Sequence, residues 1–220
     1  MIPKGKRYLW TGLGLVLLFG LWTVLVQWVD VETIGETETQ VGFSTLNGWF
    51  HRCTGVHLTL YTLTDWLGLV PIFICFLFAG LGLVQLIRRK HLFRVDIDLL
   101  LLGVYYIVVI GCYLLFEMIP INYRPIFIEG RLEASYPSST TLLVVSVMPT
   151  LAFQASRRLK SKPAKWTLQI LSAGFSIFMV VGRLISGVHW LTDIVGAVLL
   201  STGLFRLYQA AVLLQDQKEQ

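Results

Sequence analysis

The sequence predicts an all-α integral membrane protein built as a bundle of six transmembrane helices. Only 14% of its 220 residues are charged and 55% are hydrophobic, and the mean hydropathy is +0.69. An ordinary soluble domain carries about a quarter charged residues. The composition therefore excludes an ordinary soluble domain and a disordered chain. The length of the apolar runs is the further observation that predicts helices crossing a membrane.

Six apolar runs are long enough, or nearly so, for the roughly 20 residues of helix that cross a bilayer. Five of them contain no charged residue, and the sixth is interrupted only by Arg206. The fifth run is a little short and gains length by continuing past Arg183. The long side chain of an arginine can reach toward a headgroup region, so Arg206 does not exclude a transmembrane helix. The runs are Leu9–Val29, Trp66–Ile87, Leu99–Phe116, Ser138–Ser156, Trp166–Gly182 and Ile194–Leu214.

The chain is expected to have three parts. Residues 1–65 hold an N-terminal signal-anchor helix, an outer acidic loop and an interfacial segment; residues 66–214 form the helical core, and residues 215–220 form a tail. We expect the first helix to be retained, because its apolar stretch is long for a signal peptide and no alanine precedes Ala79. The acidic loop has no His or Asp at ligand spacing, so we expect no metal, and no motif calls for a cofactor.

The basic residues predict the orientation in the membrane. If the N-terminus is cytoplasmic and the helices alternate, fourteen of the eighteen Lys and Arg residues fall on the cytoplasmic side. This positive-inside bias predicts a multi-pass protein of the cell membrane with both termini in the cytoplasm. It also accounts for the net charge of +5 without nucleic acid as a partner. Nothing in the sequence indicates an oligomeric state.

Three short polar segments interrupt the apolar background, and the alternating topology places all of them on the outer side. They cover residues 117–125, 136–141 and 182–193. Ionisable groups at membrane depth cost several kcal/mol when they are unpaired, so such groups are functional candidates by default. We therefore expect the three segments to form one extracytoplasmic site.

The residue types in these segments suit phosphoryl chemistry. Arginines such as Arg124 and Arg183 can hold phosphate oxygens through planar, bidentate hydrogen bonds. The stretch from Pro137 to Thr140 is a favourable helix start, with hydroxyls for capping and free N–H groups that suit an anion. His189 and Asp193 stand four residues apart and would share a helix face, where the carboxylate can orient the imidazole for attack on phosphorus.

These motifs together resemble the type-2 phosphatidic acid phosphatase / haloperoxidase superfamily, in its membrane lipid phosphatase branch. The resemblance rests on Arg-Pro at 124–125, Pro-Ser at 137–138 and Arg-x5-His-x3-Asp at 183–193. It covers roughly residues 60–212 and the six-helix layout. The third motif is the specific one, although Gly182 replaces the usual serine.

The resemblance also implies roles for individual residues. His189 would be the nucleophile and Asp193 its orienting partner. Phosphate oxygens would be held by a further set of groups, namely Arg124, Arg183, Ser138, the N–H of Ser139 and Thr140.

Two positions depart from the family pattern. Glu117 stands where the family has lysine, and Thr140 stands where it has the histidine that protonates the leaving group. Three explanations are open. Glu117 can be a partly buried, protonated substitute acid; the substrate can be a diphosphate, whose leaving group needs less protonation; or hydrolysis can be lost in favour of binding or phosphotransfer. The plainest alternative for Glu117 is a salt bridge to Arg124 or Arg183 that shapes the pocket.

The preferred function is a metal-independent phosphatase acting on a lipid diphosphate or monophosphate through a phosphohistidine. The missing acid makes a polyprenyl diphosphate the preferred substrate, ahead of phosphatidate or phosphatidylglycerol phosphate. A lipid phosphotransferase using the same histidine is one alternative. A catalytically weak membrane protein that binds a lipid phosphate is the other.

Overall fold

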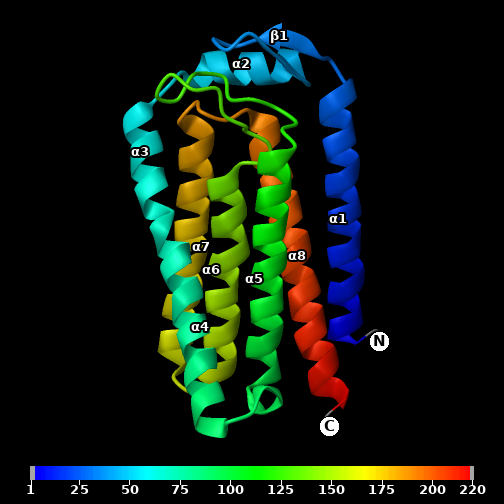
Figure 1. The fold of residues 1–220 in the computed structure, drawn as a ribbon, viewed down its shortest axis with the longest axis vertical. Coiled ribbons are helices and arrows are strands. Elements are labelled where there is room, and N and C mark those ends of the chain that lie inside the picture. Colours follow the sequence, from blue (N-terminus) through cyan, green and yellow to red (C-terminus); the bar gives the residue numbers. More distant parts are fainter. Residues whose placement is uncertain (1–2, 219–220) are drawn as a thin grey trace.

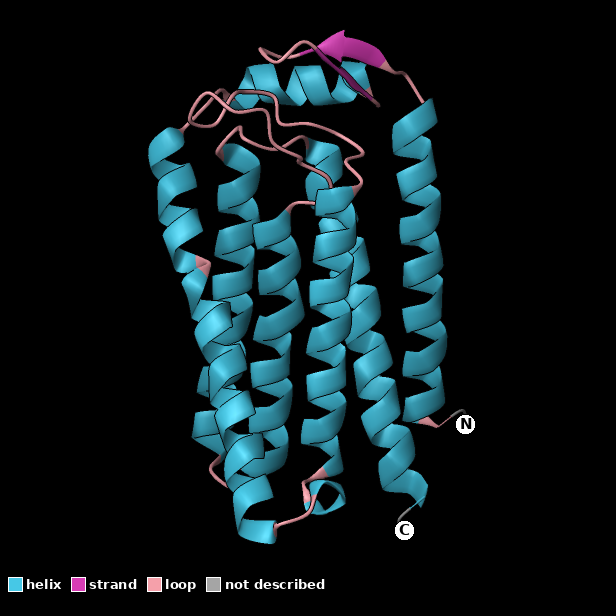
Figure 2. Ribbon diagram, in the orientation of Figure 1, coloured by secondary structure: helices cyan, strands magenta, loops and turns pink. Residues whose placement is uncertain are grey.

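The computed structural model describes residues 3–218 and shows a bundle of long helices closed at one end by a cap of shorter elements (Figures 1 and 2). Both termini lie at the opposite end of the bundle. The elements follow in the order α1 (Lys4–Trp28), β1 (Glu32–Ile34), β2 (Thr39–Val41), α2 (Ser44–Thr54), α3 (Leu58–Leu67), α4 (Leu69–Arg89), the short 3-10 helix η1 (Leu92–Arg94), α5 (Ile97–Met118), α6 (Ser139–Arg158), α7 (Lys162–Ile185) and α8 (Leu191–Lys218).

The six predicted transmembrane helices are confirmed. Within the described residues, six helical spans are long and apolar enough to cross a membrane, and each coincides with one of the predicted runs to within one residue or extends beyond it. The second span is longer than predicted, because α3 and α4 together cover Leu58–Arg89. The added residues include the polar Thr64, whose side chain is fully buried. At the other end of the chain α8 reaches Lys218, which makes most of the predicted tail helical; residues 219–220 lie outside the described part.

Helices α1 and α8 pack closely along their length because glycines on each helix face side chains of the other. A Cβ on Gly12 would lie 2.8 Å from Leu207 Cδ2, and one on Gly203 would lie 2.9 Å from Val16 Cγ2. Small residues permit this kind of close helix approach in membranes, where apolar burial alone does not drive association. The first helix is therefore an integral part of the bundle.

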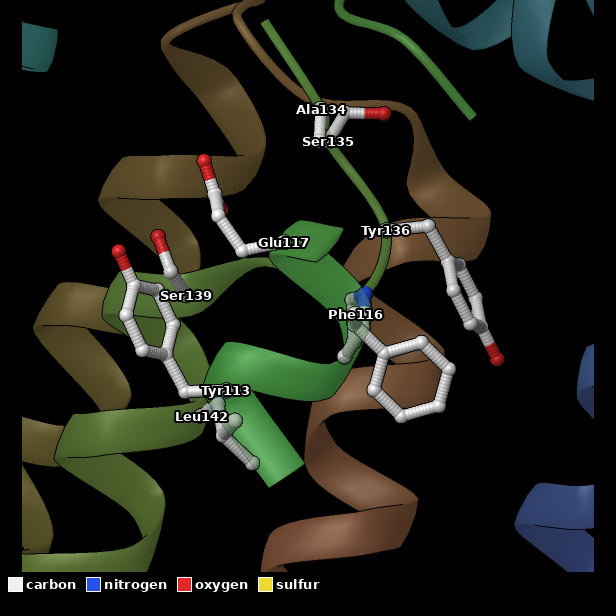
Figure 3. A pocket seen from close by; sticks show the side chains of 9 residues that line it. Tyr113, Phe116, Glu117, Ala134, Ser135, Tyr136, Ser139 and Leu142 are labelled. Carbon is white, nitrogen blue, oxygen red and sulfur yellow. The ribbon is translucent and has the colours of Figure 1, made fainter. Parts of the chain in front are cut away.

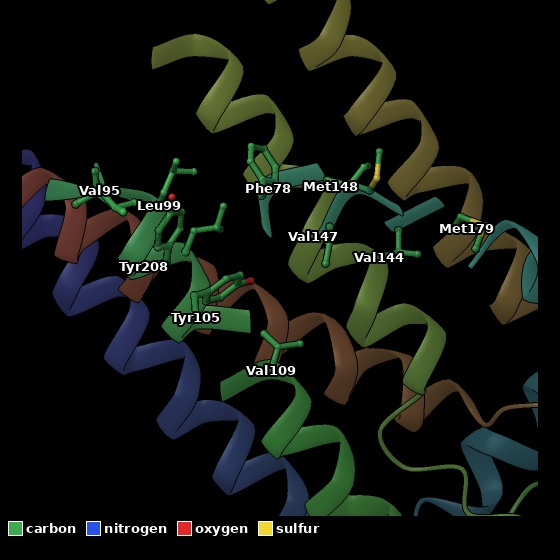
Figure 4. Packing of buried hydrophobic residues seen from close by; sticks show 13 residues of the cluster. Phe78, Val95, Leu99, Tyr105, Val109, Val144, Val147, Met148, Met179 and Tyr208 are labelled. Carbon is green, nitrogen blue, oxygen red and sulfur yellow. The ribbon is translucent and has the colours of Figure 1, made fainter. Parts of the chain in front are cut away.

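The apolar core lies among α4, α5, α6, α7 and α8 (Figure 4). Its centre is formed by Leu102, Val144, Val147 and Met179, each of them at most 1% exposed. Near the termini, a set of ion pairs joins the ends of these helices: Arg157 and Arg158 both pair with Asp98, at 3.2 and 2.7 Å. The core and these ion pairs hold the helices in register below the cap.

The cap consists of the β1–β2 hairpin, α2 and the loop of residues 119–138. Helix α2 lies across the end of the bundle, over the loop and the ends of the long helices (Figure 1). It is tied to the start of α8 by the buried Asn47, whose Nδ2 donates to Thr192 Oγ1 at 3.0 Å. The cap thus covers the end of the bundle at which the three polar segments meet.

The turn from α7 to α8 depends on a glycine. Gly187 has φ of +71°, and a Cβ there would lie 2.1 Å from the carbonyl oxygen of Gly55. Only glycine combines this backbone conformation with such a close approach. Because the turn leads directly into His189, the approach to Gly55 fixes where that histidine enters the bundle.

A matched pair of substitutions tests this constraint. Gly130 also has positive φ, at +74°, but a Cβ there would meet nothing within 4 Å. Gly130→Ala should therefore lower stability only by the backbone strain, about 1–2 kcal/mol. Gly187→Ala should lower stability by a further 1–3 kcal/mol or so because of crowding. Apparent melting temperatures in detergent measure both; equal losses in the two variants would contradict the packing described.

Candidate functional site

The structure brings the key residues of all three polar segments together beneath the cap. Arg183 lies in the last turn of α7, His189 in the turn that follows, and Asp193 in the first turn of α8. Arg124 comes from the loop of residues 119–138, and Ser138 immediately precedes α6. All five side chains are at least nine-tenths buried. The predicted convergence of the segments is confirmed as geometry.

The prediction that His189 and Asp193 share one helix is wrong. Helix α8 begins at Leu191, so His189 lies in the turn before it. The two side chains still face each other, with His189 Nδ1 3.8 Å from Asp193 Oδ2. The turn before α8 brings the two side chains together. In this turn the Trp190 N–H donates to Asp193 Oδ2 at 2.9 Å. At 3.8 Å the contact is longer than a hydrogen bond, and such contacts often tighten only when substrate binds.

Asp193 is held by groups from several segments. Besides the Trp190 N–H, its Oδ1 accepts from Asn122 Nδ2 at 3.2 Å. Its backbone oxygen accepts from the Ser138 N–H, also at 3.2 Å. This carboxylate is fully buried, so its orientation depends on these donors. It therefore links the 119–138 loop, the start of α6 and the start of α8.

His189 is kept neutral by its surroundings. Burial lowers its pKa well below the ordinary value, and the positive charges of Arg124 and Arg183 lower it further. Neither ring nitrogen has a hydrogen-bond partner among residues 3–218. Because Nδ1 faces Asp193, a proton on Nδ1 leaves Nε2 with a free lone pair. A neutral imidazole of this kind is the form that can act as a nucleophile.

The two site arginines share one tyrosine ring. The guanidinium carbon of Arg183 lies 4.8 Å from the ring centroid of Tyr61, and that of Arg124 lies 5.6 Å away. Cations over an aromatic face are attracted to its quadrupole, most strongly where water is excluded. Tyr61 in α3 therefore holds two like charges in the same small volume.

Carboxylates at the rim pair with each arginine. Glu133 Oε2 lies 3.1 Å from Arg124 Nε, and Asp65 Oδ1 lies 3.6 Å from Arg183 Nη1. Asp65 is well exposed, at 59% of its side chain, so its charge is screened by water. Thr64 Oγ1 and the Tyr61 carbonyl also lie near Arg183 Nη1, at 3.4 and 3.5 Å.

Some arginine donors remain unused. Arg124 Nη1 and Arg183 Nε are buried and have no hydrogen-bond partner within the described chain. Buried donors are almost always paired in native proteins, and an unpaired one costs about 1–3 kcal/mol. Two such donors beside a neutral histidine form a site whose missing partner is an anion.

The second polar segment forms the expected helix start. Helix α6 begins at Ser139, so the N–H groups of its first turn have no acceptor within the helix. Ser138 Oγ donates to Thr141 Oγ1 at 3.1 Å and does not cap a backbone N–H, which differs from the predicted capping role. Thr140 lies beside the α3–α4 junction, where its methyl carbon would be 3.7 Å from a Cβ on Gly68. Its hydroxyl makes no hydrogen bond within residues 3–218.

Glu117 does not form the predicted salt bridge to Arg124 or Arg183. Its side chain is exposed rather than partly buried, and it borders a small pocket with Tyr113, Ser135 and Ser139 (Figure 3). The physical reason is a β-bridge between Tyr123 and Ala134, which sets the chain around Arg124 against Glu133. The Arg124 N–H donates to the Glu133 carbonyl at 3.0 Å, so Glu133 occupies the position expected for Glu117.

Several residues of the site were not found from the sequence. Glu133 and Tyr61 both lie outside the three polar segments that the sequence singles out. Tyr61, Thr64 and Asp65 recur at helical spacing and so lie on one face of α3, the only local signal they carry. Their partner Arg183 is more than a hundred residues away in the sequence. Local spacing cannot predict a contact between residues so far apart.

Comparison with known proteins agrees with this architecture. Residues 103–215, just over half of the chain, match the PAP2 superfamily. The chain belongs to this superfamily. No curated protein matches the chain in sequence.

A similar solved structure is the crystal structure of the first transmembrane PAP2 type phosphatidylglycerolphosphate phosphatase from Bacillus subtilis. The two chains are 18% identical, with a TM-score of 0.63, over 96% of this chain and 98% of the other. The likeness establishes a common fold along nearly the whole chain. It therefore includes α1 to α4, which lie outside the family match.

The tyrosine shared by the arginines gives a direct test of the site. Tyr61→Leu removes the ring and should weaken binding of inorganic phosphate by about tenfold, since each desolvated cation–π contact contributes about 0.5–2 kcal/mol. Tyr61→Phe keeps the ring and should bind phosphate as the wild type does. Isothermal titration of the three purified proteins measures this. Equal affinities for the leucine variant and the wild type would refute the role of the ring.

Proposed function

We propose that the protein is a membrane phosphatase that removes phosphate from a lipid diphosphate or monophosphate, through a phosphohistidine at His189. One observation carries the proposal above all. A buried, neutral histidine with free ring nitrogens lies beside two arginines that have unpaired donors. Membership of the PAP2 superfamily supports the same chemistry.

The residues suggest a two-step reaction. His189 Nε2 attacks the terminal phosphorus while the bond from that phosphorus to the leaving oxygen breaks. The electron pair stays on the leaving oxygen, which is the bridging oxygen of a diphosphate or the ester oxygen of a monophosphate. Asp193 stabilises the positive imidazole that forms, as its oxygen faces Nδ1. Arg124 and Arg183 donate to the phosphoryl oxygens as charge develops on them. Water then attacks phosphorus, breaks the P–N bond and regenerates the histidine.

The nature of the leaving group favours a diphosphate. Thr140 cannot supply a proton to an alkoxide, because a hydroxyl is too weak an acid at neutral pH. Departure of a phosphate from a diphosphate needs much less protonation. We therefore place a polyprenyl diphosphate first and phosphatidate or phosphatidylglycerol phosphate second. The similar Bacillus subtilis structure is named a phosphatidylglycerolphosphate phosphatase, which is a reason to keep monoesters among the candidate substrates.

We also propose that the site is extracytoplasmic and that both termini are cytoplasmic. In support, the termini lie at the end of the bundle remote from the site (Figure 1). Most of the basic residues belong to segments at that same end, which agrees with the positive-inside rule.

The departures at Glu117 and Thr140 favour a second candidate. A protein with this site but without a proton donor can hold a lipid phosphate with little turnover, or pass its phosphoryl group to another acceptor. Glu117 lies outside the arginine cluster, so it adds no donor there. Binding without release, or phosphate found on a second lipid, would identify these alternatives.

Phosphate release from a panel of lipid diphosphates and monophosphates tests the proposal. The wild type should release phosphate fastest from the diphosphates. His189→Ala should lose at least about a thousandfold in turnover, because no other group can take the nucleophile's place. Thr140→His should raise monoester turnover by about tenfold to a hundredfold, since it restores a proton donor.

His57→Ala serves as the matched control, because the His57 side chain is exposed and, within the described residues, its ring bonds only to the backbone of Thr54. It should retain wild-type turnover. Equal release by the wild type and His189→Ala would contradict the mechanism. Absence of release from every lipid by the wild type would instead favour the binding function.

A further inference from the structure

A second arginine pair lies at the other end of α8, against α1. An open pocket of about 450 Å³ lies between these helices, lined by Arg7, Tyr8, Thr11, Leu15, Leu18 and Arg206 among others. Arg206 follows Asp193 by thirteen residues, which places it about 20 Å along α8 from the phosphate site. The two sites are therefore separate.

The two arginines share a tyrosine ring, as the site arginines do. The guanidinium carbon of Arg206 lies 4.8 Å from the ring centroid of Tyr8, and that of Arg7 lies 6.0 Å away. Arg206 Nη1 also donates to Gln209 Oε1 at 3.0 Å. Within residues 3–218 neither arginine has a carboxylate as an ion-pair partner. Their charges are concentrated at one pocket, and no carboxylate of the described part of the chain pairs with them.

Three other arginines near this end of the bundle are paired with carboxylates. Arg157 and Arg158 both pair with Asp98, and Arg89 pairs with Asp96 at 2.8 Å. Those guanidiniums belong to a neutralised structural network. Arg206, in contrast, lies within a transmembrane span, where a charge without a partner costs at least about 2–3 kcal/mol. It therefore needs either water or an anion supplied from outside the chain.

We propose that this pocket binds the phosphate of an anionic phospholipid from the leaflet next to the termini. The guanidiniums of Arg7 and Arg206 would hold the phosphate oxygens in planar hydrogen bonds, as arginine does for phosphate in general. Leu15 and Leu18 continue the pocket along α1 toward the middle of the bilayer and offer an apolar wall for an acyl chain. Headgroup and chain contacts thus follow one another in the order that a lipid requires.

The pocket is a binding site and not a second catalytic site. Its lining offers the hydroxyls of Tyr8, Thr11 and Thr202 but no histidine, cysteine or carboxylate, so it holds no general base that could activate a hydroxyl for phosphoryl transfer. Because the lipid would bridge α1 and α8, it would add to the close glycine-mediated contact of these helices. This inference does not depend on the proposed activity.

Photo-crosslinking in vesicles tests the proposal. The purified protein is reconstituted with phosphatidylglycerol or phosphatidylcholine that carries a diazirine on one acyl chain, and the labelled peptides are mapped by mass spectrometry. Phosphatidylglycerol should label residues 11–18 and 202–206, whereas phosphatidylcholine should label them weakly. Arg7→Gln combined with Arg206→Gln should lower the labelling about thirtyfold, since each basic residue contributes about a fivefold factor to anionic-lipid binding.

Lys6→Gln is the matched control, because Lys6 is an exposed basic residue next to Arg7 that does not line the pocket. It should retain the labelling. Helical circular dichroism and gel-filtration elution show whether the double variant is folded; if it is not, Arg206→Gln alone should still lower the labelling about fivefold. Equal labelling by the two lipids, or equal labelling of the wild type and the folded variants, would overturn the proposal.

Discussion

The candidate site depends on one electrostatic constraint: two buried guanidiniums lie over the same tyrosine ring beside a neutral histidine. Arg124 and Arg183 repel each other, and Tyr61 offsets that repulsion without neutralising their charge. Their joint field also lowers the pKa of His189, which keeps its imidazole neutral. The arrangement is therefore complete only when an anion arrives. In the proposed mechanism, phosphate binding by the arginines and the neutral state of His189 therefore have the same physical origin.

The rest of the fold maintains this constraint. The core around Leu102 and Val144 keeps the long helices parallel, so the ends of α3, α7 and α8 meet at one level. The side chains of Arg124, Arg183 and His189 are buried beneath the cap, and charge interactions are stronger at buried positions than in water. Helix α3 supplies Tyr61 and Asp65, although it lies outside the family match. The first part of the chain thus contributes to the site as well as to the membrane anchor.

The sequence predicted the architecture well, because membrane insertion selects long apolar runs that composition reveals directly. It also placed Arg124, Arg183 and Asp193 in one cluster, since alternating topology brings alternate loops to the same face. Local sequence spacing gave wrong predictions where the backbone is not helical. The interval between His189 and Asp193 suggested a shared helix, but the turn at Gly187 ends α7 first. The sequence suggested Glu117 as the ion-pair partner of Arg124, whereas the structure has Glu133 in that place. The β-bridge that brings Glu133 to Arg124 lies in an irregular loop, where the sequence has no periodic pattern to reveal it.

The most direct test of the central claim is to trap the intermediate. The purified protein is mixed with a polyprenyl diphosphate labelled in the terminal phosphate, quenched in alkali to preserve phosphohistidine, and mapped by mass spectrometry. Phosphate is expected on the peptide that contains His189, at a level that falls as the substrate is exhausted. Phosphate on a different residue, or continued release with no phosphorylated peptide, would contradict it.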